Sequence, residues 1–476
     1  MKISLIQSIL PLDRVPSTEP LGLGYLASFL ETKGYNDIKI FCDFDSDRDI
    51  IRHSSGSDII GISSLSQPIK HANFLANEIK KNNPKTLIVL GGAHPTILSD
   101  STLNNRNIDY VVRGEGEITF YELVKSIEEK KDMNMVDGIS YYRNDKIYHN
   151  KPRKLIENLN TLPFPSRDLL RQRDYSSRIY KKFGNKIATV LGSRGCPFQC
   201  IHCAANSVWT RQWRSRSPEN IIEEVEMLIA EYGIQRIEFI DSIFTLNKEK
   251  VLEFCRLMRK KNIDVEWGCY AHVNTVDNEM LVAMKNAGCF RLRIGVESGS
   301  PLILKEIKKG VDVENIKKTF NVIRKLNLDV TAFIIVGYPS ESYDTIRESE
   351  NIIKAIRPSH ICFSILTPLP GSEIYQIAKQ NGYIKNEIDW SKLSLDKAIL
   401  PTRYLSTEDI TREYKRLKRK FKYFDAFSIT TNNTGYALLV LMYKIFVKIK
   451  MRPFIIFCSK VSSFLQYSIM EIFNKN

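Results

Sequence analysis

The chain has 476 residues, which is enough for two or three domains. Hydrophobic residues make up 43% and charged residues 26%, as in an ordinary globular protein, and nine cysteines are too few for a disulfide scaffold. The formal net charge is +15, and residues 403–476 contribute +9 of it, from 14 Lys and Arg against 5 Asp and Glu. A basic surface suits nucleic acid, anionic lipid or an anionic substrate. We find no nucleic-acid-binding motif in the sequence and expect no nucleic-acid partner.

The first 130 residues alternate short apolar runs with helical patterns. We predict strands at 2–8, 38–42, 58–63, 86–90 and 109–112, and helices at 21–33, 69–82, 96–104 and 117–130. Strands that alternate with helices indicate a doubly wound parallel sheet covered on both faces. The sequence therefore predicts an α/β domain at 1–135. Its apolar start is too short for a signal peptide.

Small and polar residues follow the predicted strands, where open parallel sheets bind their ligands. They are Ser63, Ser66, Gly91, Gly92, His94, Gly114, Glu115 and Gly116, with Leu21 and Gly22 opening the first helix. Glycine at these ends lets a bulky ligand approach the backbone. For any one of them alone, a tight turn between strand and helix is the better explanation.

A hairpin and a linker are predicted at 136–185, where Pro163 and Pro165 keep the chain extended. A second βα series follows at 186–382. Its predicted strands are 186–193, 235–241, 265–270, 290–296, 329–336 and 360–367, and its predicted helices are 218–232, 248–261, 278–287, 313–326, 342–356 and 372–381. Six such units indicate a partial (β/α)6 barrel, whose chemistry sits at the carboxyl ends of the strands.

A cysteine loop follows the first barrel strand. Cys196, Cys200 and Cys203 have the spacing C-x-x-x-C-x-x-C. Three thiolates are one short of the four that an iron–sulfur cluster normally takes, which leaves one iron open. The alternatives are a zinc site completed by His202 or a remote residue, and three ordinary buried thiols.

This loop resembles the signature of the radical SAM superfamily. The resemblance implies that the three cysteines bind a [4Fe–4S] cluster whose open iron holds S-adenosylmethionine (SAM), with Phe198 beside it. It also implies that Glu297, after the fourth barrel strand, binds the SAM ribose, and that the segment at Gly337 packs on the adenine. Asp241, after the second strand, would hold substrate or the SAM amino group; its alternative is an ordinary acid at a helix start.

The stretches 20–27, 91–96 and 112–117 resemble the cobalamin-binding domain that precedes many radical SAM domains. The resemblance implies that the small residues at the strand ends bind cobalamin, with His94 as a contact. The axial histidine of the D-x-H-x-x-G pattern is missing after the first strand, and His53 matches that pattern poorly. We therefore expect no protein imidazole on the cobalt.

Residues 383–476 are predicted to be helical, basic and rich in apolar residues. The stretch 412–424 carries an apolar stripe beside seven basic residues, and lysines and an arginine interrupt the apolar segment 436–470 too often for a membrane span. A peripheral membrane contact, or shelter for a lipid-like substrate, is one expectation. A helical cap on the barrel is the other.

The resemblance as a whole implies an enzyme that forms a 5′-deoxyadenosyl radical and methylates an unactivated carbon with the help of cobalamin. Oxidative cyclisation or rearrangement on the same scaffold is the alternative, and a non-catalytic zinc- and ligand-binding protein is the alternative of another class. We expect a small-molecule or lipid-like substrate and a reducing partner such as a flavodoxin or ferredoxin. Reduced thiols fit a cytoplasmic location, with membrane association as an option.

Overall fold

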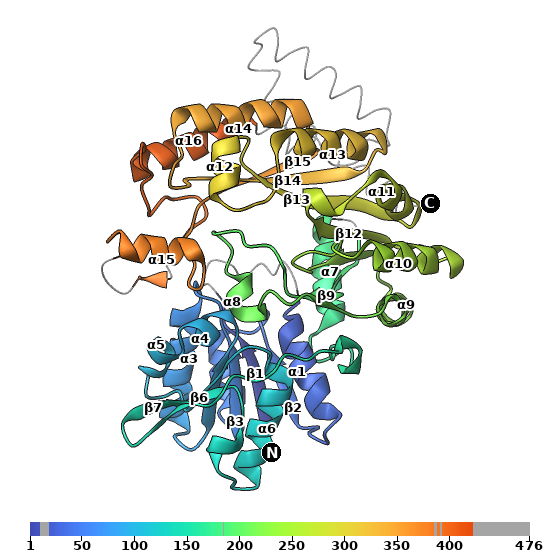
Figure 1. The fold of residues 1–476 in the computed structure, drawn as a ribbon. Coiled ribbons are helices and arrows are strands. Elements are labelled where there is room, and N and C mark those ends of the chain that lie inside the picture. The colour runs from blue at the N-terminus through green and yellow to red at the C-terminus, as the bar shows by residue number, and fades with distance from the viewer. Residues whose placement is uncertain (10–18, 184, 385–387, 391–392, 422–476) are drawn as a thin grey trace, which may run out of the picture.

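Two sheets form the two halves of the chain, one above the other in Figure 1. The computed structural model describes all residues except 10–18, 184, 385–387, 391–392 and 422–476. The first sheet has seven strands, and the second has six that are all parallel. The prediction of two consecutive βα series is confirmed.

The first sheet has the strand order β2-β1-β3-β4-β5-β6-β7. Its strands are β1 (Ile3–Gln7), β2 (Ile38–Phe41), β3 (Ile59–Ser63), β4 (Leu87–Gly91), β5 (Tyr110–Val112), β6 (Ile139–Arg143) and β7 (Lys146–His149). Its helices are α1 (Leu21–Glu31), α2 (Asp47–Ser54), α3 (Ile69–Asn82), α4 (Ala93–Ile97), α5 (Ser99–Leu103) and α6 (Gly116–Glu128). Leu5 packs in the core beneath α1 and α6, and its neighbour Ile6 packs in the core beneath α2 and α3. Both faces are thus covered, as parallel strands require.

The hairpin β6–β7 belongs to this first sheet. β6 pairs antiparallel with β5, with Tyr141 opposite Tyr110, and β7 forms the edge. The sheet therefore extends past residue 135, where the sequence predicted the end of the first domain. The helix α2 was not predicted because it is mostly polar. Only two of its eight residues, Ile50 and Ser54, are buried.

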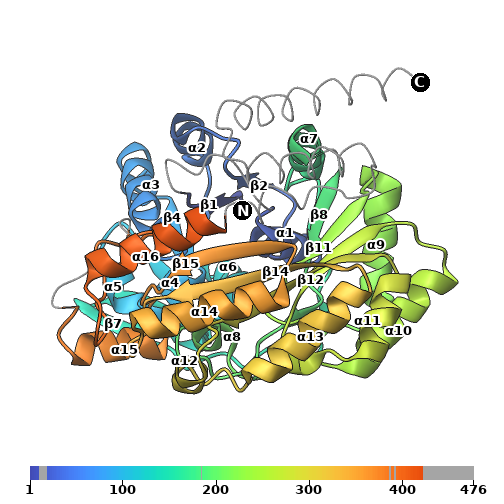
Figure 2. The ribbon, with the colours of Figure 1, turned by 90° about the horizontal axis from the view of Figure 1, so that it is seen from above.

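The second sheet has the order β15-β14-β13-β12-β11-β8, which is chain order and describes an open partial barrel. Its strands are β8 (Ile187–Val190), β11 (Arg236–Phe239), β12 (Glu266–Ala271), β13 (Cys289–Glu297), β14 (Asp329–Val336) and β15 (His360–Ile365). The helices of this half are α7 (Gln172–Phe183), α8 (Ala205–Trp209), α9 (Pro218–Tyr232), α10 (Lys248–Lys260), α11 (Asn278–Asn286), α12 (Pro301–Glu306), α13 (Val313–Lys325), α14 (Tyr343–Ile356) and α15 (Glu373–Gln380). Figure 2 shows α10, α11, α13 and α14 along the outside of the curved sheet.

The last described helix, α16 (Thr407–Lys420), packs on the barrel beside β15. Tyr414, Leu417 and Phe421 of its apolar stripe are buried in the barrel core. On its basic face, Arg416 and Lys420 both pair with Glu350 of α14. The membrane expectation is therefore not supported for this helix, because its apolar stripe is already buried against the protein.

The predicted apolar segment 436–470 lies outside the described residues. Among the helices that the structure describes, none is long and apolar enough to cross a membrane.

A buried ionic cluster joins the linker to the barrel. The carboxylate of Glu224 on α9 is fully buried and pairs with Arg167 of the linker, at 2.5 Å, and with Arg216. Arg167 also donates to the backbone oxygen of Thr189 in β8, at 2.9 Å. From the N-terminal half, the buried Glu19 accepts from the Thr189 hydroxyl at 2.7 Å. Buried charges of this kind are tolerated only when they are paired and hydrogen-bonded.

We predict that Glu224→Gln lowers the free energy of unfolding by about 3–5 kcal/mol, because two buried guanidinium groups lose their counter-charge. Urea unfolding followed by circular dichroism measures the change. The matched control is Glu253→Gln, which breaks the exposed pair with Arg256 and is expected to change nothing measurable. Equal stability of the two variants would contradict the structural role of Glu224.

Candidate active site between the two sheets

The carboxyl ends of both sheets face one another across the cysteine loop. The short helix α8, which follows the third cysteine, lies between the two halves in Figure 1 and contacts α4 at the strand ends of the first sheet. From the barrel side, Gly371 lies against the same region, since a Cβ there would stand 3.0 Å from the Ile97 side chain. The two sets of predicted site residues therefore meet in one place.

A two-stranded ladder closes the base of the cysteine loop. β9 (Ser193–Arg194) enters the loop, β10 (Arg214–Ser215) leaves it, and the two pair antiparallel. Gly195 turns the chain with φ +88°, and a Cβ there would stand 2.2 Å from the Gln212 backbone oxygen. Only glycine, which has no Cβ, fits at this point, where the chain entering the loop passes close to the chain leaving it.

The three loop cysteines are free thiols. Cys196 and Cys200 are half-buried and Cys203 is exposed. Burial raises the pKa of Cys200 to about 11, although the nearby Lys309 ammonium opposes this shift. The donor set fits a cluster held by three sulfurs, since thiolates are the ligands such clusters take and a cation beside them favours the thiolate form.

His202, the histidine of the zinc alternative, contacts the barrel through one ring nitrogen, and such a contact is also usual for a zinc-bound histidine. Its Nδ1 lies 3.2 Å from the Tyr338 hydroxyl. Among the residues that the structure describes, no group of three His, Cys, Asp or Glu side chains is close enough to hold one metal ion.

Glu297 lies at an irregular end of β13, next to the cysteine loop. The pairing of β13 with β14 shifts register there, and Glu297 has φ +65°. Its Oε1 accepts from Lys309 Nζ at 2.9 Å, and both side chains are buried. Burial raises the pKa of Glu297, but the Lys309 charge outweighs this and leaves the pKa below its usual range. Glu297 is therefore an ionised acceptor beside the cysteines, and Lys309 is a site residue that the sequence analysis missed.

Phe198 stacks on His272, with ring centroids 3.9 Å apart. His272 Nδ1 accepts from the Asn274 backbone N–H at 3.2 Å, which leaves the proton of the neutral ring on Nε2. Burial lowers the pKa of His272 to about 4, so the ring is neutral at pH 7. The buried Nε2 makes no hydrogen bond of ordinary geometry with the described residues, although the Lys309 backbone lies close enough to oppose the lowering of this pKa.

Gly337, at the end of β14, has φ +99°, and its backbone N–H donates to Glu341. Glu341 is fully buried, and burial raises its pKa to about 8. This acid, which the sequence analysis did not single out, holds the turn at the predicted adenine segment in place.

Asp241 lies inside the protein, where it braces the strand ends. Its carboxylate accepts from the Gly192 backbone N–H at 3.0 Å and from the Ser193 hydroxyl at 2.5 Å. Burial raises its pKa to about 6. These contacts tie the end of β11 to the entrance of the cysteine loop. Asp241 therefore stabilises the junction between these two segments and is not an acid at the start of a helix, which was the alternative.

The strand ends of the first sheet are closely packed. His94 is buried, its Nδ1 lies 3.0 Å from Ser66 Oγ, and burial lowers its pKa to about 4. Gly92 has φ +95°, and a Cβ there would lie 2.7 Å from the Ser64 backbone oxygen, close to Ser63. The poor axial candidate His53 is exposed on α2, where Nδ1 contacts the Asp49 backbone oxygen.

The other predicted cobalamin contacts differ in their surroundings. Gly91 ends β4, and Gly114 has φ +76° with open space where a Cβ would be. Gly116 packs against α1, Leu21 is in the core and Gly22 is exposed. Glu115 is not open to a ligand, because its carboxylate pairs with Arg194 and Arg214.

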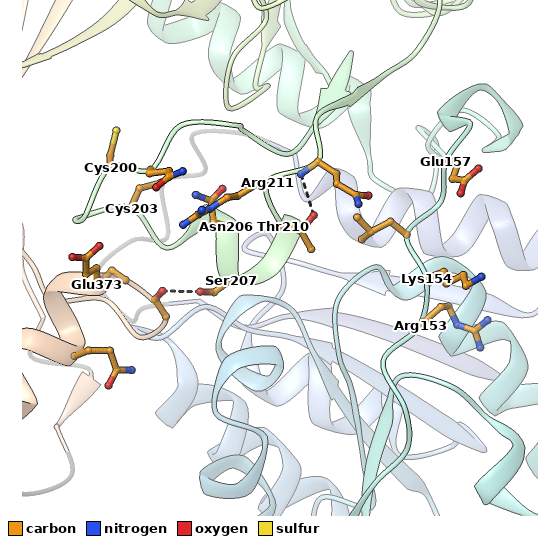
Figure 3. Close-up of a pocket in the computed structure, with 16 residues that line it drawn as sticks. Arg153, Lys154, Glu157, Cys200, Cys203, Asn206, Ser207, Thr210, Arg211 and Glu373 are labelled. Atoms are coloured by element: carbon orange, nitrogen blue, oxygen red, sulfur yellow. Dashed lines mark hydrogen bonds between the residues drawn. The ribbon is translucent and has the colours of Figure 1, made fainter. Parts of the chain in front are cut away.

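A cavity of about 970 Å³ opens beside Cys200 and Cys203 (Figure 3). Its walls come from the linker at 153–157, the cysteine loop with α8, and the start of α15. The lining is polar or charged except for Leu155, Gly371 and the two cysteines. Asn206 Oδ1, in the same wall, is buried without a hydrogen-bond partner among the described residues.

Known protein families and individual proteins share this architecture. The radical SAM superfamily model matches residues 190–353, and the B12-binding domain model matches residues 12–124. An uncharacterized methyltransferase of Pyrococcus horikoshii is 32% identical over 87% of this chain and 91% of its own length. An anaerobic magnesium-protoporphyrin IX monomethyl ester cyclase of Rubrivivax gelatinosus is 29% identical over 75% of this chain and 66% of its own.

Two solved structures share the fold. The radical SAM methyltransferase TsrM from Kitasatospora setae, with cobalamin and a [4Fe–4S] cluster bound, aligns with TM-score 0.68 and 17% identity, over 87% of this chain and 82% of its own. The cobalamin-dependent radical SAM enzyme OxsB aligns with TM-score 0.66 and 20% identity, over 88% of this chain and 61% of its own. The chain belongs to the radical SAM superfamily, among the members that carry an N-terminal B12-binding domain.

Proposed function

We propose that this enzyme transfers a methyl group from cobalamin to an unactivated carbon of a small polar molecule. The observation that carries the proposal is that the strand ends of the cobalamin-binding domain face the cysteine loop at the mouth of the barrel. Cobalamin and SAM held at these edges would share one substrate. The similarity to the Pyrococcus methyltransferase over nearly the whole chain supports methyl transfer.

The cofactors supply the hard chemistry: SAM on the cluster yields a 5′-deoxyadenosyl radical, and methylcobalamin carries the methyl group. The chain's residues bind and orient them. Cys196, Cys200 and Cys203 would hold the cluster. Glu297, kept ionised by Lys309, would accept hydrogen bonds from the ribose hydroxyls of SAM.

The substrate would enter through the 970 Å³ cavity beside Cys200 and Cys203. Most of the lining residues have polar or charged side chains, although their carbon atoms make up the larger share of the cavity surface. We therefore propose a small substrate that carries hydrogen-bonding groups, because a few well-placed polar groups fix the orientation of a ligand. A reduced flavodoxin or ferredoxin would deliver the electron to the cluster.

Oxidative cyclisation is the second candidate, since the Rubrivivax relative is named a cyclase. One experiment separates the two functions. The anaerobically reconstituted enzyme, with SAM, cobalamin and a reductant, is incubated with a small-molecule extract, and new ions are identified by mass spectrometry. Methyl transfer gives products heavier by one methyl group, which take up label from methyl-labelled SAM. Products lighter by hydrogen atoms, without label, would favour cyclisation.

We predict that Cys196→Ala, Cys200→Ala and Cys203→Ala each abolish formation of 5′-deoxyadenosine, because two thiolates do not hold a cluster with an open iron. Circular dichroism should be unchanged. Cys362→Ala, at an exposed cysteine on β15 outside the loop, is the control and should retain full activity. Wild-type rates of SAM cleavage in any loop variant would refute the cluster assignment.

We also predict that cobalamin binds without a protein nitrogen on cobalt. His53 lies on the exposed face of α2, and His94 is buried against Ser66. Electron paramagnetic resonance of the cob(II)alamin form should show identical hyperfine structure for unlabelled and uniformly ¹⁵N-labelled protein. A splitting that changes with the label would identify an axial protein ligand and contradict this prediction.

A further inference from the structure

Glu115 stands between the two arms of the cysteine loop. Its Oε1 accepts from Arg194 Nη1 at 2.9 Å, and its Oε2 accepts from Arg214 Nη1 at 2.9 Å. Arg194 lies on β9, which enters the loop, and Arg214 lies on β10, which leaves it. Glu115 comes from the other half of the protein, directly after β5 and before α6.

Without this carboxylate, the two arginines would repel each other. Arg194 and Arg214 are direct cross-strand partners in the β9–β10 ladder. Like charges placed directly opposite in a ladder destabilise it. The side chains are 4% and 9% exposed, and that of Glu115 is 3% exposed, so solvent does little to screen the repulsion.

Three further contacts strengthen the same joint. Glu117, on the first turn of α6, pairs with Arg194 at 2.6 Å. The Arg214 guanidinium also donates to the Ile156 backbone oxygen at 2.6 Å, and the Ile156 N–H donates to Glu115 at 2.8 Å. Two carboxylates and two guanidinium groups balance in charge. Burial raises the pKa of Glu115, but Arg214 and Arg194 outweigh burial and leave that pKa below its usual range.

We propose that Glu115 is a positioning residue that closes the base of the cluster loop and fixes it to the cobalamin edge of the first sheet. The carboxylate is the shared counter-charge that lets β9 and β10 pair. It belongs to the turn that contains Gly114, where the backbone is open to a ligand. The same turn thus borders the cobalamin site and holds the cluster loop, which fixes the spacing of the two cofactors in the proposed methyl transfer.

The test depends on charge. Glu115→Gln keeps the shape but leaves two buried guanidinium groups facing each other with one carboxylate, Glu117 on Arg194, to balance them, so the loop base should open. Adding Arg214→Met removes one of these charges and should allow the ladder to close again. Restoration by a second deletion is the signature of repulsion, and a residue that only fills space would not produce it.

The readouts are iron bound per chain after anaerobic reconstitution, and the magnetic coupling between cob(II)alamin and the reduced cluster in the loaded protein. We expect Glu115→Gln to bind less than half the wild-type iron and to show altered coupling. The double variant should recover most of the iron. The control Glu266→Gln, which breaks an ion pair with Arg236 at the amino end of β12, should match wild type in both readouts.

Wild-type iron and coupling in Glu115→Gln would overturn the proposal, and so would a double variant that binds no more iron than Glu115→Gln. If circular dichroism shows that Glu115→Gln is unfolded, the double variant decides alone, because the proposal requires it to fold and bind iron. The proposal rests on the two cofactors sharing one site. A wild-type enzyme that loads both cofactors but transfers no methyl group would refute the proposed function and leave these iron measurements standing.

Discussion

Buried pairs of carboxylate and guanidinium groups hold the two sheets with their carboxyl ends toward one another, and the site depends on that placement. Glu224 joins the linker to α9, and Glu115 joins the first sheet to the ladder beneath the cysteines. Such pairs contribute little net free energy compared with an apolar contact, but breaking one is costly because a lone charge stays buried. They also demand one geometry, since a guanidinium donates in fixed directions. An apolar interface allows several relative positions of its two sides. These ion pairs allow one, and they thereby fix the two sheet edges at which the cofactors would bind.

Buried polar contacts also fix side chains at the mouth of the barrel. Lys309 keeps Glu297 ionised, Glu341 holds the turn at Gly337, and Asp241 ties β11 to the loop entrance. In each of these three cases a hydrogen bond or ion pair fixes a buried carboxylate at the mouth of the barrel. Radical chemistry needs this rigidity, because the reacting groups must be held in one orientation and within reach of one another.

Sequence periodicity predicted the elements well where one face is apolar and the ends are marked. The helix at 218–232 has the predicted bounds because Ser217 caps it, Pro218 opens it and Gly233 ends it in the left-handed region. The cysteine loop was recognised because its residues are adjacent in the chain. The pairing of Glu115 with two arginines could not be predicted, because these partners lie 79 and 99 residues away and no local pattern records such a pair. Lys309 was missed for a similar reason, since it follows Lys308 just after α12 and looks like any solvated lysine.

The basic helix α16 shows why the C-terminal region was ambiguous. An apolar stripe opposite lysines and arginines is what a membrane surface selects and also what a protein surface with acidic neighbours selects. The two cases differ in the surface against which the helix packs. Here Glu350 on α14 forms ion pairs with Arg416 and Lys420. Phe363 of β15 packs against Phe421. An acid on one neighbouring element and an aromatic ring on another match both faces of the helix at once, so its composition is explained by the barrel edge that it covers.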